Sequence, residues 1–370
     1  MERLQYCFSA AAKAVISQIL LGKEGVFVFF IFLGSKVKKA LSAFLVIISV
    51  LAAAFVLNIN VYDLINLEYS DRTGENVYMG SRNFGNLSRE EVSEIIRERL
   101  VEWQINPVDA VYNPRDNSII PELQGYEVNV EATVEKIMNA EPGEEIEPVF
   151  EPLFPLIRME DYPSAVITRG NPKKQKVSFM INVAWGEEYI PEMLALFSEL
   201  NVKANFFVVG EWAEQNKRML KEINKNGHLI GNHGHSDKVV YTELTGEEIK
   251  EGIHEVNSTV EELTNAEVSF FTPHKGEYND LVLEVVSREN MRTVLWSLDT
   301  VDWMEPGVEE MKSRVLDNLH NGAIILMHPT SDTVDFLKEA IPFIQGKGME
   351  IVTLKELFNP EYYPYYPNLK

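Results

Sequence analysis

Cysteine is almost absent from this sequence of 370 residues, which contains a single one, Cys7. The chain therefore cannot form an internal disulfide, and a zinc site built from several thiolates is also excluded. Basic residues are few as well: 34 lysines and arginines stand against 56 acidic residues, for a net charge of -22. Because nucleic-acid binding needs a basic face, nucleic acid is not expected as a partner. Any metal would have to be held by histidine, aspartate, glutamate or asparagine.

The charge is distributed unevenly along the chain. Residues 1–57 contain six basic and two acidic residues, a net of +4, so the remaining 313 residues carry -26. A basic head before an acidic body is typical of an exported bacterial protein. The length suits two domains, and the 45% share of apolar residues excludes a wholly disordered chain.

One uncharged run of eighteen residues, Ala40–Leu57, predicts a transmembrane helix of about 27 Å, close to the hydrocarbon thickness of a bilayer. Three lysines stand directly before it: Lys36, Lys38 and Lys39. They predict a cytoplasmic N-terminal side and a body on the extracytoplasmic side of the cell membrane. Two alternatives stay open: a single-pass anchor, which the length favours, or a signal sequence cleaved near residues 52–54, which would release a secreted body. The segment 1–39 is either a basic N-terminal extension or a misassigned start, with translation beginning at Val37.

A linker at 58–77 leads to the segment 78–157, which has the pattern of a small α+β module. A capping box at Ser88–Glu91 predicts the start of a helix, because apolar residues recur after it at helical spacing. Turn-forming residues separate the first two strands. The further expected elements are strands at 110–112, 118–120 and 146–150 and a second helix at about 130–138.

After a linker at 158–170, residues 171–357 alternate between strand and helix signals, and an aromatic tail follows at 358–370. The alternation indicates a parallel sheet, and about seven strands suggest a distorted, closed or nearly closed (β/α) barrel. The fold class is therefore α/β, preceded by the α+β module and the transmembrane helix. The expected strands are Val177–Ile181, Asn205–Val209, His228–Ile230, Glu267–Phe271, Arg292–Trp296, Ala323–Met327 and Glu350–Thr353.

Chemistry in such barrels lies at the carboxyl ends of the strands, and polar residues gather there. Asn182 follows the first expected strand and Asp299 follows the fifth. Four of the seven histidines also stand just after expected strands: His233, His235, His274 and His328. A single histidine is usually structural, but this many at one end of a barrel indicates a functional site, active or ancestral.

The sequence around these positions resembles the polysaccharide deacetylase (NodB-homology) family. The resembling segments are KANFFVVG at 203–210, GHLIGNH at 227–233, Pro273 with GEYN at 276–279, Asp299-x-x-x-Trp303 and Leu326-x-His328. The resemblance implies a barrel whose relatives use a divalent metal, usually zinc, to hydrolyse acetyl groups of chitin, peptidoglycan or xylan. The segments 181–186 and 326–330 resemble a sporulation-associated, YlxY-like subgroup.

Position by position, the resemblance implies an incomplete catalytic site. The base aspartate of the family falls on Asn182 and its metal aspartate on Val183, while the arginine that orients the base falls on Thr272. Of the two metal histidines, His233 is kept and the second falls on Asp237. The acid half, His328 with Asp299 as its expected carboxylate partner, is intact, and the substrate groove is expected at Trp303, Leu326, Pro273 and His274. Because an amide is no general base and valine is no metal ligand, neither standard deacetylase activity nor tight zinc binding is expected.

Three functions stay open. The first is a glycan-binding or scaffolding protein that has lost the activity. The second is an active deacetylase with a relocated metal site, in which His235 or His274 joins His233 and Asp237. Glu187 or Glu188 would then act as the base. The third is an envelope interaction protein that uses the acidic body or the aromatic tail.

The α+β module at 78–157 gives a separate indication of the binding partner. Segments such as Asn86–Val92, Ala110–Asn113 and Gly125–Val128 resemble the peptidoglycan-binding module found beside VanW-type domains. The resemblance implies peptidoglycan or a related N-acetylated polysaccharide as the partner, and the alternative is a spacer between membrane and barrel.

Overall fold

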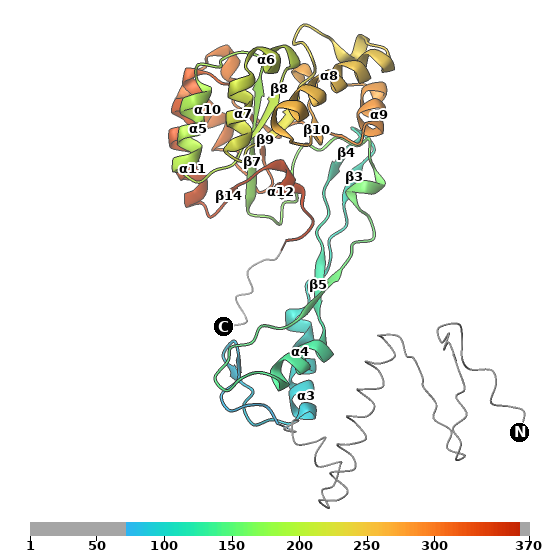
Figure 1. Ribbon diagram of the computed structural model, residues 1–370, viewed down its shortest axis with the longest axis vertical. Coiled ribbons are helices and arrows are strands. Elements are labelled where there is room, and N and C mark those ends of the chain that lie inside the picture. Colours follow the sequence, from blue (N-terminus) through green and yellow to red (C-terminus); the bar gives the residue numbers. More distant parts are fainter. Residues whose placement is uncertain (1–71, 363–370) are drawn as a thin grey trace, which may run out of the picture. The chain divides into compact units, whose positions relative to one another are not determined.

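The computed structural model describes residues 72–362, and Figure 1 shows their arrangement. The expected transmembrane helix at Ala40–Leu57 and the basic segment before it lie outside the described residues. Among the described helices, none combines the length and the apolar character that are needed to cross a bilayer. The described chain contains α+β elements up to Leu153 and a parallel α/β sheet from Lys176 onward.

The α+β segment of the described chain has two helices and three two-stranded antiparallel sheets. Its elements are β1 Tyr78–Met79, β2 Arg82–Asn83, α3 Arg89–Trp103, β3 Val111–Asn113, β4 Ser118–Ile120, β5 Gly125–Val128, α4 Val130–Met138 and β6 Phe150–Leu153. The expected helices and the β3–β4 hairpin are present. The strand expected at 146–150 begins only at Phe150, because Phe150 pairs with Val128 at the end of β5.

Eight strands of the described chain form one sheet, and all of its pairings are parallel as expected. They are β7 Lys176–Val183, β8 Asn205–Val208, β9 Leu229–Asn232, β10 Phe270–Phe271, β11 Arg292–Thr293, β12 Leu298–Asp299, β13 Ile324–Met327 and β14 Glu350–Ile351. The order is β11-β10-β9-β8-β7-β13-β12, and β14 pairs with the start of β7. β12 is the strand that sequence reasoning missed, since two residues produce no apolar run.

The sheet is an open half-barrel, so the expectation of a closed or nearly closed barrel was wrong. No pairing joins the end strands β11 and β12 in the described chain. Both end strands are only two residues long, too short for a further ladder. The segment before β7 lies at this gap instead, where Ile167 bridges to Val294 and Arg169 bridges to Ala323.

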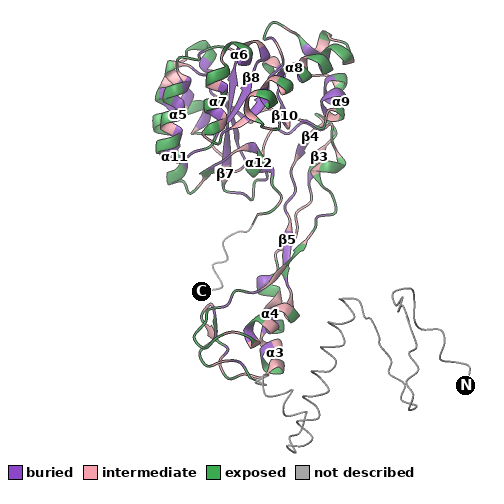
Figure 2. Ribbon diagram, in the orientation of Figure 1, coloured by how far each residue is buried: buried purple, intermediate pink, exposed green. Residues whose placement is uncertain are grey.

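Helices cover the outer face of the sheet, and Figure 2 shows their outward sides exposed and the strands buried. They are α5 Ile190–Glu199, α6 Gly210–Gln215, α7 Lys217–Lys225, α8 Gly246–Thr264, α9 Asp280–Arg288, α10 Val308–Val315 and α11 Ser331–Gly346. β7 is buried along seven of its eight residues. Side chains alternate along a strand, so Ile181 and Val183 pack in the outer core beneath the helices. Met180 and Asn182 face the inside of the half-barrel.

The inside of the half-barrel is filled at the amino ends of its strands. Met180 and Phe207 meet Ile119 of the β3–β4 hairpin and Leu357 of α12 (Leu354–Phe358) in a second apolar cluster. The ammonium of Lys174, only 2% exposed, donates hydrogen bonds to the backbone carbonyls of Glu356, Leu357 and Asn359. These contacts close the amino end of the half-barrel, so its open space lies at the carboxyl ends.

Candidate functional site

A cavity of about 490 Å³ lies at the carboxyl ends of the strands. Its lining residues are Asn182, Ala184, Trp185, His233, Asp237, His274, Lys275, Trp296, Asp299, Trp303, Leu326 and His328. The structure thus brings together most of the residues that the sequence nominated, from five strands of the sheet and the loops that follow them. Pro273 is buried and does not line the cavity, and neither does His235.

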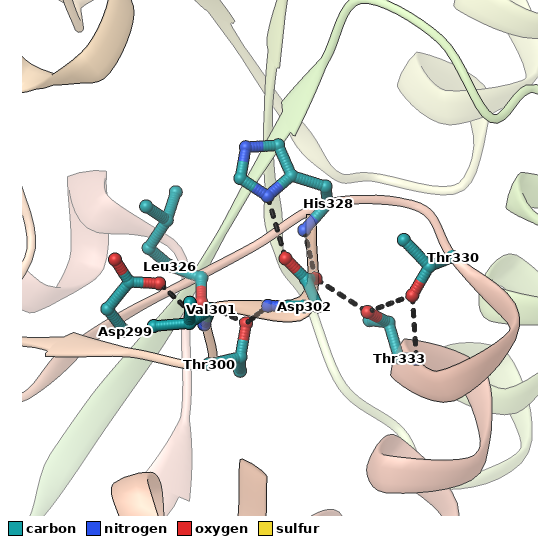
Figure 3. A network of polar contacts seen from close by, with 8 residues as sticks. All are labelled: Asp299, Thr300, Val301, Asp302, Leu326, His328, Thr330 and Thr333. Carbon is teal, nitrogen blue, oxygen red and sulfur yellow. Dashed lines mark hydrogen bonds and ion pairs between the residues drawn. The ribbon is translucent and has the colours of Figure 1, made fainter. Parts of the chain in front are cut away.

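The partner of His328 is Asp302, whereas the sequence predicted Asp299. The Asp302 carboxylate is fully buried and accepts a hydrogen bond from the His328 amide at 2.5 Å. It also contacts His328 Nδ1 at 2.8 Å and accepts one from the Thr333 hydroxyl at 2.6 Å (Figure 3). The Nδ1 contact orients the ring and leaves Nε2 on the side away from Asp302, facing the cavity.

Asp299 stands beside this network without touching His328. One of its oxygens accepts a hydrogen bond from the Val301 amide at 2.8 Å. Burial raises the pKa of the Asp299 carboxyl above its ordinary value, and the nearby charge of Asp302 raises it further. Asp299 is level with Leu326 of β13, which is 3% exposed and forms an apolar floor between Asp299 and β7.

Asn182 is the inward-facing residue near the end of β7. Its side chain is 4% exposed, and its Oδ1 has no hydrogen-bond partner in the described structure. An amide takes no proton near neutral pH, so Asn182 cannot serve as a base. Val183, the next residue, is fully buried in the outer core and does not line the cavity.

The histidines on the far wall are buried and close together. The His233 and His274 rings lie 4.1 Å apart, and His233 Nδ1 is 2.7 Å from the Thr272 carbonyl oxygen. Burial lowers the pKa of His233 well below its ordinary value and also lowers the pKa of His274. Both rings are therefore neutral at neutral pH.

These residues do not fit a divalent metal. In the described part of the chain, no three histidine, aspartate, glutamate or cysteine side chains converge on one point. His235 turns outward to Glu255, with 3.1 Å between Nδ1 and Oε2, so it does not join His233. His274, the other candidate, does lie beside His233, but no third side chain converges with these two rings in the described residues. Glu187 and Glu188 are exposed and lie outside the cavity lining. A standard zinc-assisted step therefore has no ligand set here.

Aromatic side chains surround the cavity mouth. Trp185 is 42% exposed, and its ring stacks on His328 with 5.9 Å between ring centres and 8° between planes. Trp303 is 58% exposed, and Trp296 lies deeper. Trp185 and Trp296 were not assigned to the site from the sequence. Trp185 stands two residues after β7, which was the available signal, whereas Trp296 was placed inside the expected strand Arg292–Trp296, although β11 ends at Thr293.

Two family models match this chain. The model "Polysaccharide deacetylase" matches residues 169–294, and "Putative peptidoglycan binding domain" matches residues 84–147. The uncharacterized protein YlxY of Bacillus subtilis is 34% identical over 272 residues, which are 74% of this chain and 85% of YlxY. A peptidoglycan-N-acetylglucosamine deacetylase of Bacillus cereus is 33% identical over 176 residues, 46% of this chain and 64% of that protein.

Two solved structures have a fold similar to that of this chain. BA3943 of Bacillus anthracis, a CE4 family pseudoenzyme, superposes with a TM-score of 0.63 at 31% identity, over 73% of this chain and 96% of that one. A BA3943 mutant with restored enzymatic activity gives the same TM-score at 30% identity, over 73% and 99% of the two chains. The extended match to YlxY, the matched family model and the shared half-barrel agree, and the chain belongs to the polysaccharide deacetylase (CE4) family.

Proposed function

We propose that this chain binds the glycan strands of peptidoglycan in its cavity and leaves their acetyl groups in place. The observation that carries the proposal is that the cavity keeps residues able to contact a sugar but lacks a general base and a set of metal ligands. The half that contacts a sugar is present in His328, held by Asp302, and in the exposed rings of Trp185 and Trp303. The half that would activate water holds an amide at Asn182 and no metal ligand set in the described residues.

The retained groups suit recognition of a sugar chain. Indole rings present flat apolar faces, against which the C–H face of a pyranose ring can pack. His328 Nε2 can hydrogen-bond a sugar hydroxyl, because the contact with Asp302 fixes the orientation of its ring. With no base at position 182, the cavity does not activate a water molecule for the hydrolysis of an acetyl group.

The proposal places the protein in the cell envelope. The match of residues 84–147 to a peptidoglycan-binding model supports a second contact with the same polymer. With Ala40–Leu57 as a membrane anchor, the cavity would face the cell wall from the outer side of the membrane. Protease added to protoplasts should then digest the body, whereas full protection would contradict this topology.

Binding and catalysis can be tested on the same sample. We expect the full-length chain in mild detergent to bind a peptidoglycan glycan fragment saturably in calorimetry, and to release no acetate from it with or without zinc. Trp303→Ala should weaken binding about fivefold, because it removes an exposed aromatic platform. Phe343→Ala is the matched control, since this ring is 41% exposed on α11 and does not line the cavity.

Two results would contradict the proposal. Zinc-dependent release of acetate by the wild type would favour the relocated metal site and an active deacetylase. Equal loss of binding in Trp303→Ala and Phe343→Ala, or no binding at all, would show that the cavity is not the glycan site and would favour the interaction protein.

A further inference from the structure

Two oxygens that line the cavity can each accept a hydrogen bond from a ligand. Asn182, 4% exposed and lining the cavity, has an Oδ1 without a partner in the described structure. Asp299 uses one carboxylate oxygen for the Val301 amide, and Figure 3 shows its second oxygen without a drawn contact. A buried acceptor without a donor is costly, so Asn182 Oδ1 calls for a ligand that supplies a donor. Asp299 is only partly buried, and its second oxygen is open to a donor from the cavity.

The strand register places these two acceptors on opposite sides of one sugar-sized space. Asp299 is level with Leu326, and Leu326 is level with Met180. Asn182 lies two residues beyond Met180 and therefore on the same face of β7. Two strand spacings separate β12 from β7, about 10 Å. One pyranose ring resting on the Leu326 side chain fits between them.

No basic side chain is paired directly with the carboxylate on the Asp299 side in the described structure. Asp237 and Lys275 both line the cavity and both act on His274, so their opposite charges offset each other on the far wall. Asp299 has no ion pair in the described structure. The nearest arginine that acts on it, Arg314, is bound to Glu310 at 3.0 Å on the protein surface.

We propose that the sugar unit in this cavity carries a free ammonium group, as in a de-N-acetylated amino sugar of a peptidoglycan strand. An ammonium at C2 has three donors and no acceptor, which suits the free oxygen of Asp299. A sugar hydroxyl on the other side of the ring can donate to Asn182 Oδ1. An acetamido group has one donor, and its carbonyl would face the carboxylate. The indole faces of Trp185 and Trp303 also attract a cation.

This inference rests on the proposed function and specifies its ligand. Glycan binding in the cavity is shared by both statements, and the chemical state of the sugar at C2 is what the inference adds. The protein would then recognise the product of an active N-deacetylase, so a deacetylation reaction must come before its binding step.

The test compares two oligosaccharides of equal length. The tetramer of glucosamine and the tetramer of N-acetylglucosamine are titrated into the full-length chain in mild detergent, at a mildly acidic pH that keeps the amine protonated. Salt at about 0.15 M shortens the Debye length to about 8 Å and suppresses attraction to the acidic surface. We expect the glucosamine tetramer to bind at least about tenfold more tightly, the effect of one charge-assisted hydrogen bond.

Substitutions assign the preference to one carboxylate. Asp299→Asn keeps the shape and the acceptor for the Val301 amide but removes the charge, so the preference should fall to about one. Asp317→Asn is the matched control, because Asp317 is exposed and stands before β13, at the opposite end of that strand from the cavity. It should keep the full preference.

The outcomes separate the two statements. Equal binding of both tetramers, or tighter binding of the acetylated one, overturns the inference and leaves glycan binding in place. A preference that Asp299→Asn and Asp317→Asn lower equally also overturns it, since the attraction is then to the surface as a whole. Absence of binding by either tetramer overturns the inference and the proposed function together.

Discussion

Asp302 allows the architecture of the site to be tested by a single substitution. Its carboxylate is fully buried and accepts hydrogen bonds from the His328 amide, the His328 ring and the Thr333 hydroxyl. Asp302→Ala leaves the amide and ring donors of His328 without the fully buried acceptor that they use, while the Thr333 hydroxyl can still donate to Thr330 Oγ1 at 2.9 Å. Each such donor costs about 1–3 kcal/mol, and because the donors are coupled we expect a total loss of about 4 kcal/mol of unfolding free energy.

Asp299 provides the internal comparison. It accepts one hydrogen bond, from the Val301 amide, and it borders the cavity, where solvent can replace the lost acceptor. Asp299→Ala should therefore cost about 1 kcal/mol. The informative quantity is the difference between the stability losses of the two variants, because both remove one carboxylate from the same short segment of chain.

Urea unfolding followed by tryptophan fluorescence measures both costs. Four of the five tryptophans lie in the parallel α/β part of the chain: Trp185, Trp212, Trp296 and Trp303. With an unchanged urea dependence, the shift of the midpoint gives the difference in stability directly. A loss below about 1 kcal/mol in Asp302→Ala, or an equal loss in both variants, would refute the network drawn in Figure 3.

Three further predictions concern other parts of the half-barrel. Burial lowers the pKa of His228 from 6.5 to about 4, so the unfolded chain binds more protons between these values. Stability should therefore fall as the pH drops through this window, by at most about 3 kcal/mol, and His228→Asn should flatten the decline in urea midpoints. Val183→Asp alone should lower the unfolding free energy by about 3–5 kcal/mol, because it places an unpaired carboxylate in the outer core; a midpoint like that of the wild type would contradict this. Asn182→Asp, Val183→Asp, Asp237→His and Thr272→Arg together should yield zinc-dependent acetate release from an N-acetylglucosamine tetramer, with a metal ion turning residue 183 from the outer core toward His233. Each single variant should yield little, since groups that act as a unit are not additive; equal release by one single variant would refute the shared requirement.

The carboxyl ends of the strands could be located from sequence, because buried parallel strands appear as short apolar runs with polar residues directly after them. This placed Asn182, His233 and His328 near one another before any coordinates. The partner of His328 could not be found in this way. Val301 adopts a left-handed backbone conformation, with φ of 56°, and the short helical turn Asp302–Met304 follows it directly. A β-branched residue rarely takes that conformation, so sequence pattern gives no sign of the turn.

Two features of the fold could also not be predicted from the sequence: the open sheet, and the packing of the β3–β4 hairpin against the inside of the half-barrel. A strand of two residues such as β12 carries no periodicity, so the number of strands and the closure of the sheet depend on tertiary contacts. The hairpin was assigned to the upstream module, yet Ile119 packs in the inner cluster with Met180 and Leu326. A single apolar residue on a short strand does not indicate which neighbour will cover it.

The pairing of β7 has a consequence for the order in which the molecule can assemble. Ser178 on β7 donates to the carbonyl of Val352, 174 residues further along the chain. β7 also needs β13 on one side, so its apolar residues stay uncovered until nearly the whole chain has been synthesised. Such distant contacts slow folding, and an exposed apolar strand invites aggregation during the delay. The half-barrel therefore forms only after its last strands, β13 and β14, are available to pair with β7.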